Sequence, residues 1–507
     1  MHFNMKGLLI RNGFSLDAKP QPHIYLSLYD AFKRAILNRF LEPDSKLPPS
    51  RVLANDLGIS RSTVLKAFDL LLVERYITAI KGSGYYVLCP KNKKLKLKIP
   101  SVAPKGNYPS LSSRGKAFCE NAHWPGEDSN KGVAFRPGLP PLDIFPVQLW
   151  KKLIDDYWKF ITPSELSYSN TIGLQCLRNN LANYLKIYRD IQCDPEQIIV
   201  TTGSLHSLYL VSNILLETDD EVVVENPTYP MAHGLFRSLG AKIFAGPVDA
   251  EGLNLNGISC VKPKFVYTTP SCQYPTGIKM SMARRKELLK WASEKETFII
   301  EDDYNHEFSN WEKPLGSLFG MDQQERTIYL GTFNKLIHPS MRLGYMIVPY
   351  YLLDAVTALY RQSSRFVSRE NQKAMSLFIE RDYLNKHLRN VMEVSQERKE
   401  IFVEHFNTYL GNHFYLDTSN PGLHVIGHIK GEIKDVELEK ELLNHNILAH
   451  ALSKYYVHPT DKNGLVMGFC SVNPKQIKDT LYKMGAIITK LHTHPMKYSK
   501  DNEKLSD

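Results

Sequence analysis

Three features that this sequence lacks exclude whole classes of protein. No unbroken apolar run is long enough to span a bilayer, and residues 1–20 lack the layout of a signal peptide. The seven cysteines are scattered and none forms a C-x-x-C pair, which gives a zinc site no support. An odd, unpatterned cysteine count suits a reducing compartment. We therefore expect a soluble, cytoplasmic protein with no metal.

The positive charge is confined to one end of the chain. The 507 residues carry 63 Lys+Arg and 53 Asp+Glu, for a net charge of +10. Residues 1–100 hold 17 of the basic and 7 of the acidic side chains, so this fifth of the chain carries the whole excess. Such asymmetry indicates a polyanion partner for the N-terminal part. The alternative is a solvated basic tail, since Lys91, Lys93, Lys94, Lys96 and Lys98 supply half of the excess.

Residues 22–90 have the pattern of a winged helix-turn-helix. Apolar residues at helical spacing predict a helix over 24–38 and a shorter one over 51–57, which Gly58 ends. Ser60 is a plausible N-cap for a third helix over 61–73. Two short strands, 76–80 and 85–88, flank the turn KGSG. A length of 507 residues also implies at least one further domain.

The third of these helices presents polar residues on its outward face. A recognition helix places its early residues against base edges, which suits Arg61, Ser62 and Lys66. Arg51 is placed for a phosphate, and Lys81 and Gly82 for close approach of the hairpin to DNA. Taken alone, Arg61 could be an ordinary surface arginine.

The segment resembles the GntR-type winged helix along nearly its full length. The matching motifs are LPPSR (47–51), LANDLGISR (53–61), Thr63-Val64 and GSG (82–84). The resemblance implies that Arg51, Arg61, Thr63 and Gly82 contact double-stranded operator DNA.

Periodicity is lost after Pro90, and residues 91–131 are read as a linker rich in Lys, Pro and Ser. The alternative is a loop packed on the next domain, anchored by Phe118 or Trp124. Five apolar runs that alternate with helical stretches then predict an open α/β sheet with ligand groups at the strand ends. These runs are 197–202, 221–225, 264–269, 297–302 and 327–332. This domain is expected to span 132–490, with a disordered tail over 491–507.

Pyridoxal 5′-phosphate (PLP) chemistry needs a lysine, a carboxylate for the pyridine nitrogen, an aromatic to stack on the ring and phosphate ligands. Asp302 ends an apolar strand and Tyr304 follows by two. The alternative for Glu301-Asp302-Asp303 is an acidic cluster facing solvent. Lys335 follows the strand that ends at Thr332, and Arg342 lies seven residues on. Thr202-Gly203-Ser204 should open a helix whose N–H groups face an anion.

Residues 132–490 resemble a fold-type I aminotransferase with a smaller C-terminal α+β subdomain, as in the MocR/GabR-type regulators that fuse one to a GntR head. The motifs are FRPGLPPLDIFP (135–146), ENPTYP (225–230), TPSCQYPTG (269–277), IIEDDYNHEF (299–308), GTFNKLIHPSMRLGY (331–345) and GLH (422–424). The resemblance implies PLP on Lys335, with Asp302 at the pyridine nitrogen and Tyr304 at the ring hydroxyl. It also implies Tyr229 stacked on the ring and Ser204, Thr332 and Arg342 at the phosphate. Tyr168 is expected to reach the phosphate of the other subunit in a homodimer.

This sequence departs from the family at Val466, where amino-acid aminotransferases carry an arginine for the substrate carboxylate. We therefore expect a PLP-dependent transcription regulator that senses an amino-acid-like or amine effector. One alternative is a working aminotransferase with an accessory DNA-binding domain. Another is a DNA-binding protein whose large domain is only a dimerisation scaffold.

Overall fold

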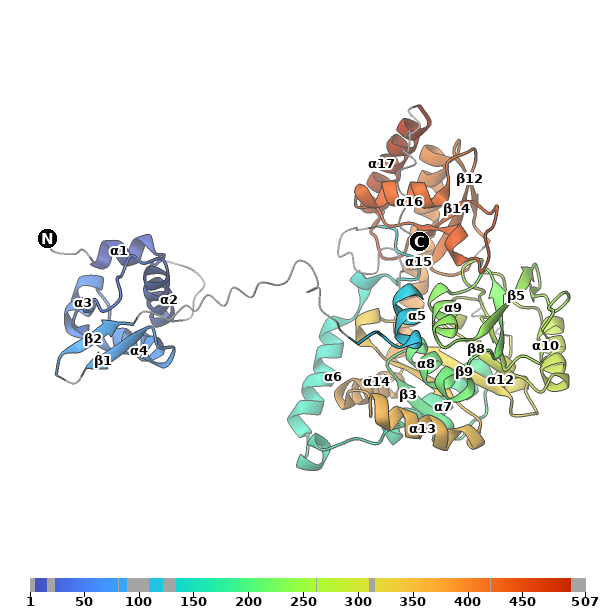
Figure 1. Ribbon diagram of the computed structural model, residues 1–507, viewed down its shortest axis with the longest axis horizontal. Coiled ribbons are helices and arrows are strands. Elements are labelled where there is room, and N and C mark those ends of the chain that lie inside the picture. Colours follow the sequence, from blue (N-terminus) through green and yellow to red (C-terminus); the bar gives the residue numbers. More distant parts are fainter. Residues whose placement is uncertain are drawn as a thin grey trace. The chain divides into compact units, whose positions relative to one another are not determined.

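The computed structural model describes residues 5–15, 23–80, 82–88, 109–121, 134–260, 262–309, 315–419 and 421–493. The chain divides into two compact units, residues 1–109 and 110–507 (Figure 1). We call them the head and the large unit. Within the described residues, no helix is long and apolar enough to cross a membrane.

The head is four helices and a two-stranded hairpin around one apolar core. Its elements are α1 (Met5–Arg11), α2 (Ile24–Leu37), α3 (Ser50–Leu57), α4 (Arg61–Val73), β1 (Ile77–Ile80) and β2 (Gly84–Val87). The expected helix-turn-helix forms as its local chemistry requires. Gly58 ends α3 with a φ of 69°, and the Ser60 hydroxyl accepts a hydrogen bond from Thr63 N–H at the start of α4. Helix α1 lies outside the expected 22–90, yet Met5 and Leu9 are buried in the head core.

The large unit is built on an eight-stranded mixed sheet in the order β3-β10-β9-β8-β7-β4-β5-β6. Its strands are β3 (Ile198–Thr201), β4 (Glu221–Asn226), β5 (Lys242–Asp249), β6 (Gly252–Leu253), β7 (Phe265–Thr268), β8 (Phe298–Asp302), β9 (Thr327–Thr332) and β10 (Gly344–Ile347). Strands β4, β5, β7, β8 and β9 run parallel. Strand β10 is antiparallel to both of its neighbours, β3 and β9.

Helices cover both faces of this sheet, because successive strand residues point to opposite faces. Val222 and Val224 pack with α8 (Ser204–Leu215), α9 (Pro230–Ser238) and α13 (Tyr350–Ser363). Val223 lies in a different core with α10 (Met282–Glu294) and α12 (Leu318–Met321). Around β3, β9 and β10, a third core includes α7 (Gln175–Arg189) and α14 (Arg369–Glu380). Both faces are therefore buried, as the apolar strands predict.

A smaller four-stranded sheet, in the order β11-β12-β14-β13, forms the C-terminal subdomain of the large unit. Its strands are β11 (Phe414–Asp417), β12 (His424–Ile429), β13 (His450–Ala451) and β14 (Gly464–Gly468). It packs against α15 (Tyr383–Leu410), α16 (Asp435–Asn444) and α17 (Pro474–Thr493). The remaining helical segments are α5 (Ser113–Asn121), α6 (Val147–Phe160), α11 (His306–Ser309), and short turns at Leu142–Ile144, Pro163–Leu166, Pro195–Gln197, Pro339–Met341 and Leu452–Tyr455.

The structure differs from the expected linker over 91–131, because α5 forms inside it and packs on α9 of the large unit. Phe118 supplies the anchor that the alternative named, since it lies against the core formed by α8, α9 and α13. Of the expected tail over 491–507, residues 491–493 belong to helix α17, and residues 494–507 lie outside the described residues, as does Trp124.

Candidate functional site

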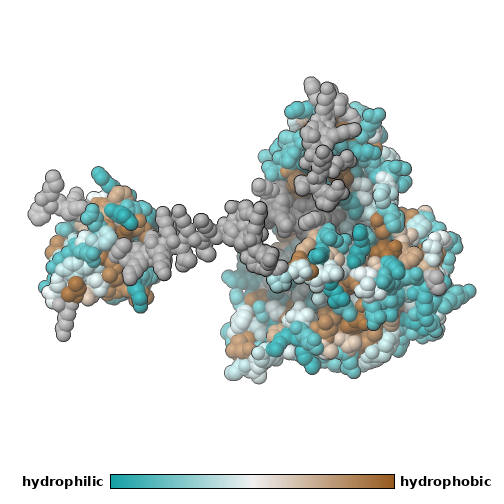
Figure 2. Space-filling view, in the orientation of Figure 1, coloured by the Kyte–Doolittle hydropathy of each residue, from teal (hydrophilic) through white to brown (hydrophobic). Residues whose placement is uncertain are grey.

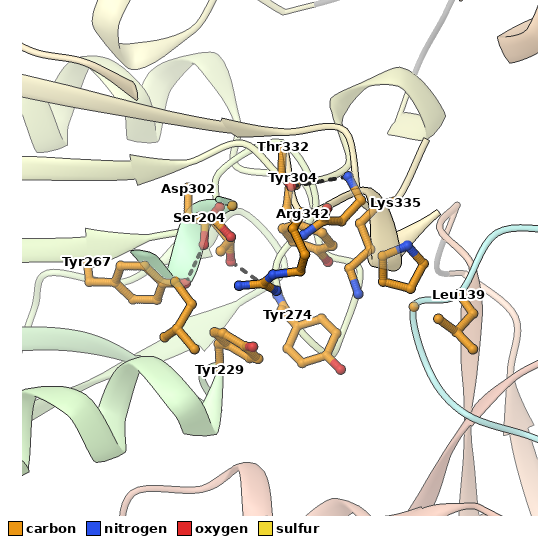
Figure 3. Close-up of a pocket in the computed structure, with 16 residues that line it drawn as sticks. Leu139, Ser204, Tyr229, Tyr267, Tyr274, Asp302, Tyr304, Thr332, Lys335 and Arg342 are labelled. Atoms are coloured by element: carbon orange, nitrogen blue, oxygen red, sulfur yellow. Dashed lines mark hydrogen bonds between the residues drawn. The ribbon is translucent and has the colours of Figure 1, made fainter. Parts of the chain in front are cut away.

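A cavity of about 260 Å³ lies in the large unit where several strands of the main sheet end (Figure 3). Its lining comes from the segments that follow the carboxyl ends of β3, β4, β7, β8 and β9, where ligands of α/β sheets are typically bound. The lining residues are Gly138, Leu139, Gly203, Ser204, Leu205, Tyr229, Tyr267, Thr269, Tyr274, Asp302, Tyr304, Thr332, Asn334, Lys335, Pro339 and Arg342. Seven of the eight predicted cofactor residues are among them, and Tyr168 is not.

Asp302 ends β8 and is only 3% exposed. Its Oδ2 accepts a hydrogen bond of 2.8 Å from the Tyr267 hydroxyl, whereas its buried Oδ1 has no hydrogen-bond partner among the described residues. Burial raises the pKa of Asp302 to about 7, against the hydrogen bond from Tyr267. The site thus holds a carboxylate with one oxygen still free to accept a donor.

The three consecutive carboxylates at this strand end are all buried, so the solvent-facing alternative is wrong. Glu301 accepts the N–H groups of Leu318 and Phe319 at 3.0 and 2.9 Å. Asp303 pairs with Arg189 at 2.6 Å; burial acts to raise the pKa of Asp303, but this cation holds it below its usual range. Of the three carboxylates, Asp302 is the one among the described residues that line the cavity.

Lys335 reaches the same cavity from the loop after β9. Burial lowers the pKa of Lys335 to about 8, and the negative charge of Asp302 acts in the opposite direction. Gly138 lies directly beside its ammonium group, since a Cβ at that glycine would stand 2.5 Å from Nζ. Glycine is favoured at this position because its φ is 72°, a backbone conformation that residues with a Cβ rarely adopt. A lysine of lowered pKa in a cavity has the properties of a nucleophile.

One end of the cavity is suited to an anion. Helix α8 begins at Ser204 after Gly203, whose φ is 128°, and this helix start lines the cavity, where helix N-termini favour an anion. The Thr332 hydroxyl accepts the N–H of Asn334 at 3.2 Å. Arg342 lines the cavity with an exposed side chain, whose guanidinium has no hydrogen bond or ion pair among the described residues. Arg342, Lys335 and Asp302 are among the labelled side chains that line this cavity in Figure 3.

Aromatic rings form the opposite wall. Tyr274 stands edge-on to Tyr229 and Tyr304, with ring centroids 5.7 and 5.6 Å apart. The Tyr304 hydroxyl also contacts Cys272 Sγ at 3.8 Å. This wall can enclose a flat ring.

Tyr267, Thr269 and Tyr274 also line the cavity and were not predicted as site residues. Strand alternation carried a usable signal for Tyr267, because it pairs with Ile300 in register and so shares a face with Asp302. Tyr274 stood inside a quoted motif, but its contacts with Tyr229 and Tyr304 join segments far apart in sequence.

Two further predicted positions lie elsewhere. Tyr168 is 76% exposed, and the Arg365 guanidinium lies 4.9 Å from its ring centroid. Val466 is fully buried in β14, in a small apolar cluster with Ile426, Leu452 and Tyr455. The large unit therefore presents an apolar side chain where the resemblance calls for an arginine.

Several of the predicted DNA contacts are exposed on the head. Arg51, Arg61 and Ser62 are exposed at the start of α3 and α4, and Arg61 Nε donates to the Ser50 hydroxyl at 3.3 Å. Gly82 lies in the hairpin turn with a φ of 81°.

The other predicted contacts of the head are placed differently. The Thr63 hydroxyl is engaged with Ser60 at 2.7 Å, and the exposed Lys66 ammonium lies 5.7 Å from the Tyr25 ring centroid. Lys81 lies outside the described residues.

Comparison with known proteins identifies both units. Residues 140–480 match the family described as aminotransferase class I and II, and residues 24–87 match the bacterial regulatory proteins of the gntR family. The chain is 29% identical to the probable rhizopine catabolism regulatory protein MocR of Rhizobium meliloti, over 94% of this chain and 96% of that protein. It is 31% identical to the uncharacterized HTH-type transcriptional regulator YdeL of Bacillus subtilis (strain 168), over 91% of this chain and 96% of that protein.

A solved structure shares the fold of the large unit. LysN, an alpha-aminoadipate aminotransferase from Thermus thermophilus complexed with N-(5′-phosphopyridoxyl)-L-leucine, has a TM-score of 0.65 and 22% identity. The match covers 76% of this chain and 96% of LysN. PLP, the cofactor expected from the sequence, is the cofactor of this fold and family. The chain belongs to the MocR/GabR-type family, in which a GntR-type winged helix-turn-helix is joined to a class I and II aminotransferase domain.

Proposed function

We propose that this protein is a DNA-binding transcription regulator whose large unit holds PLP on Lys335 and senses an amine or amino-acid-like effector there. The observation that carries the proposal is the convergence of Lys335, Asp302 and Arg342 on one cavity in a chain that begins with a GntR-type head. Its partners are operator DNA and a second copy of the chain, and its place is the cytoplasm, where that DNA lies.

The residues of the cavity fit PLP group by group. The unpartnered Oδ1 of Asp302 can accept the protonated pyridine nitrogen, which also offsets the cost of burying that carboxylate. Arg342, Ser204, Thr332 and the start of α8 can hold the phosphate. Tyr229 can stack on the ring, and Tyr304 can reach its hydroxyl.

When bound, PLP supplies an aldehyde that bonds reversibly to primary amines and a ring that withdraws electrons. Lys335 provides the resident amine, and its lowered pKa keeps a fraction of it neutral near pH 7, the form that can bond to an aldehyde. Asp302 holds the proton at the pyridine nitrogen. The tyrosine wall excludes water from one side of the ring.

The proposed homodimer would use an apolar face beside the cavity-bearing sheet. Exposed apolar side chains gather along α6 and the segment that follows it, including Trp158, Phe160 and Leu166, which are 51, 71 and 66% exposed. Figure 2 shows apolar surface near the free end of α6. A group of exposed large apolar side chains within one short segment indicates an interaction site. Tyr168 follows directly, so a second copy docked here could receive it at its own phosphate end.

The apolar surroundings of Val466 support regulation over turnover. A substrate carboxylate requires a cation, and among the described lining residues the cations are Lys335 and Arg342, both already assigned to PLP. We therefore expect effector binding without repeated transamination.

The proposal is tested by reducing the purified protein with borohydride and locating the added mass by peptide mass spectrometry. The expected result is a phosphopyridoxyl group on the peptide that contains Lys335, together with a visible absorbance band before reduction. Lys335→Ala should lose both. A wild-type protein without the band would favour the scaffold alternative, and sustained turnover with an amino acid and a keto acid would favour the aminotransferase alternative.

A further inference from the structure

Helix α5 is docked on the large unit by its C-terminal half. The Phe118 ring lies against the core formed by α8, α9 and α13. The Ser238 hydroxyl of α9 lies 3.2 Å from the Ala117 carbonyl and 2.8 Å from the Gly234 carbonyl of its own helix, and it shares its one proton between the two acceptors. At Gly234 the two helices approach so closely that a Cβ would stand 3.1 Å from the Asn121 carbonyl oxygen. The contact thus combines apolar packing, a hydrogen bond and a fitted glycine.

The helix that receives α5 begins in the cavity. Tyr229, which lines the cavity, is the N-cap residue of α9, and Pro230 follows as its first residue. Ala232, Leu235 and Phe236 of α9 lie in the same core as Phe118. Helix α9, of nine residues, therefore joins the cavity-lining Tyr229 to the surface on which α5 rests.

The C-terminal subdomain is attached at the same point. Thr228 N–H donates to the Tyr455 carbonyl at 2.9 Å, and Val457 N–H donates to Asn226 Oδ1 at 3.0 Å. The Tyr455 ring also packs against Tyr274 of the cavity wall, with centroids 5.5 Å apart. The start of α9 is thus in contact with the cavity and with the subdomain together.

We propose that α5 is the element that couples the cavity to the head, with docking on α9 strengthened when PLP fills the site against Tyr229. This inference rests on the proposed function and names how that site is regulated. Filling the site would fix the start of α9 and lower the entropy that α5 docking costs, which is positive coupling without a new contact.

Docking of α5 shortens the stretch of chain that tethers the head to the large unit. Between Leu88 and Pro109 lie 20 residues, which span at most about 70 Å whatever their conformation. If α5 is released, the next described residue of the large unit is Ala134, and the 45 residues from 89 to 133 can span up to about 160 Å. Docking would therefore restrict the half-site spacings that the two heads of a dimer can reach.

The test uses the full-length protein, loaded with PLP and stripped of it. Hydrogen exchange of the amides of α5 should slow about tenfold on loading, within the usual range of coupling between sites. Loaded wild-type protein should also discriminate more strongly between duplexes whose two half-sites are close together or far apart. Phe118→Ala should keep the PLP absorbance band and the affinity for a single half-site but lose both effects.

Two further variants test whether the effects come from the contact between α5 and α9. Gly234→Val blocks the same contact from the side of α9 and should behave as Phe118→Ala does, whereas Glu120→Ala alters an exposed residue of α5 and should behave as wild type. Equal exchange of α5 in loaded and stripped protein would overturn the coupling while leaving PLP and DNA binding intact. Absence of the PLP band or of DNA binding in wild type would overturn the coupling and the proposed function together.

Discussion

Burying the ionised Asp302 carboxylate costs free energy that its protein neighbours offset only in part. Its Oδ1 is buried and has no hydrogen-bond partner among the described residues, and the nearby Asp303 adds negative charge. Burial raises the pKa of Asp302 to about 7 from 3.8. Such a group destabilises the fold when it is ionised and becomes useful when a cation is placed against it.

Asp302→Asn should therefore have opposite effects on stability and on cofactor binding. The amide keeps a hydrogen-bond acceptor for Tyr267 but removes the buried charge, so the PLP-free variant should gain about 1–3 kcal/mol of unfolding free energy at pH 8. The raised pKa means that the wild-type protein loses stability as pH rises from about 4 to about 7. The gain should therefore grow over that window in denaturant titrations.

The same variant should bind PLP more weakly, because a neutral amide cannot hold the pyridine proton. Equal PLP affinities for the variant and wild type would contradict the role assigned to Asp302.

The lowered pKa of Lys335, about 8, sets the pH dependence of PLP attachment. Below that pH the ammonium form dominates and cannot bond to an aldehyde, so the attachment rate should rise about tenfold per pH unit and level off above pH 8. Stopped-flow absorbance on stripped protein measures this rate. A rate that kept rising to pH 10 would mean that Lys335 titrates as an ordinary exposed lysine.

For single residues, the sequence allowed prediction of those whose role is indicated by a local motif. Asp302, Lys335 and Arg342 each follow a strand in a recognisable order, and the structure brings all three to one cavity. Tyr267 was missed because its importance lies in a hydrogen bond between strands 35 residues apart. The sequence likewise could not decide whether Glu301 and Asp303 are buried or exposed, because their partners Arg285 and Arg189 come from distant helices.

The start of α4 is the element of the head on which DNA recognition rests in this account. Ser60 caps the helix, and Arg61 is held by the Ser50 hydroxyl of α3, which directs both helix starts to one surface. Pre-positioning of this kind lowers the entropy lost when a side chain meets a base or phosphate.

Arg61→Ala should weaken binding to a selected operator duplex by roughly 1–3 kcal/mol if Arg61 contacts a base. Fluorescence anisotropy at fixed salt gives the affinity, and Arg11→Ala on α1 provides a matched loss of one positive charge. If the two variants lost affinity equally, Arg61 would contribute only its charge.

At the scale of elements, prediction succeeded where one short pattern decides the structure. The helix start at Arg61 follows from the Ser60 cap, and the five apolar strands follow from burial on both faces. The helix predicted over 51–57 begins one residue earlier, at Ser50, without a side-chain cap. Strand β10 was not predicted as a strand. The start of β10 was noted only as the end of a family motif, and its antiparallel pairing with β3 and β9 depends on tertiary structure. Helix α5 was hidden in a polar segment, where docking on α9 supplies the stability that its own sequence lacks.

For the whole molecule, assembly should depend on the apolar face of α6 and the segment after it. Phe160→Asp places a charge on a side chain that is 71% exposed, and it should shift the protein from dimer to monomer in light scattering at micromolar concentration. Tyr415→Asp, at a residue 64% exposed on β11, is the control and should leave the dimer intact. A Phe160→Asp protein that remained dimeric would place the interface elsewhere.

We propose that one cavity in the large unit controls how the head binds DNA. The most direct measurement is the affinity of the full-length protein for a duplex selected from a random library, determined with PLP-loaded and stripped protein and with Lys335→Ala under PLP. The account predicts that loading changes wild-type affinity by roughly 5- to 150-fold and that Lys335→Ala does not reproduce the change. Equal affinities in all three preparations would contradict it.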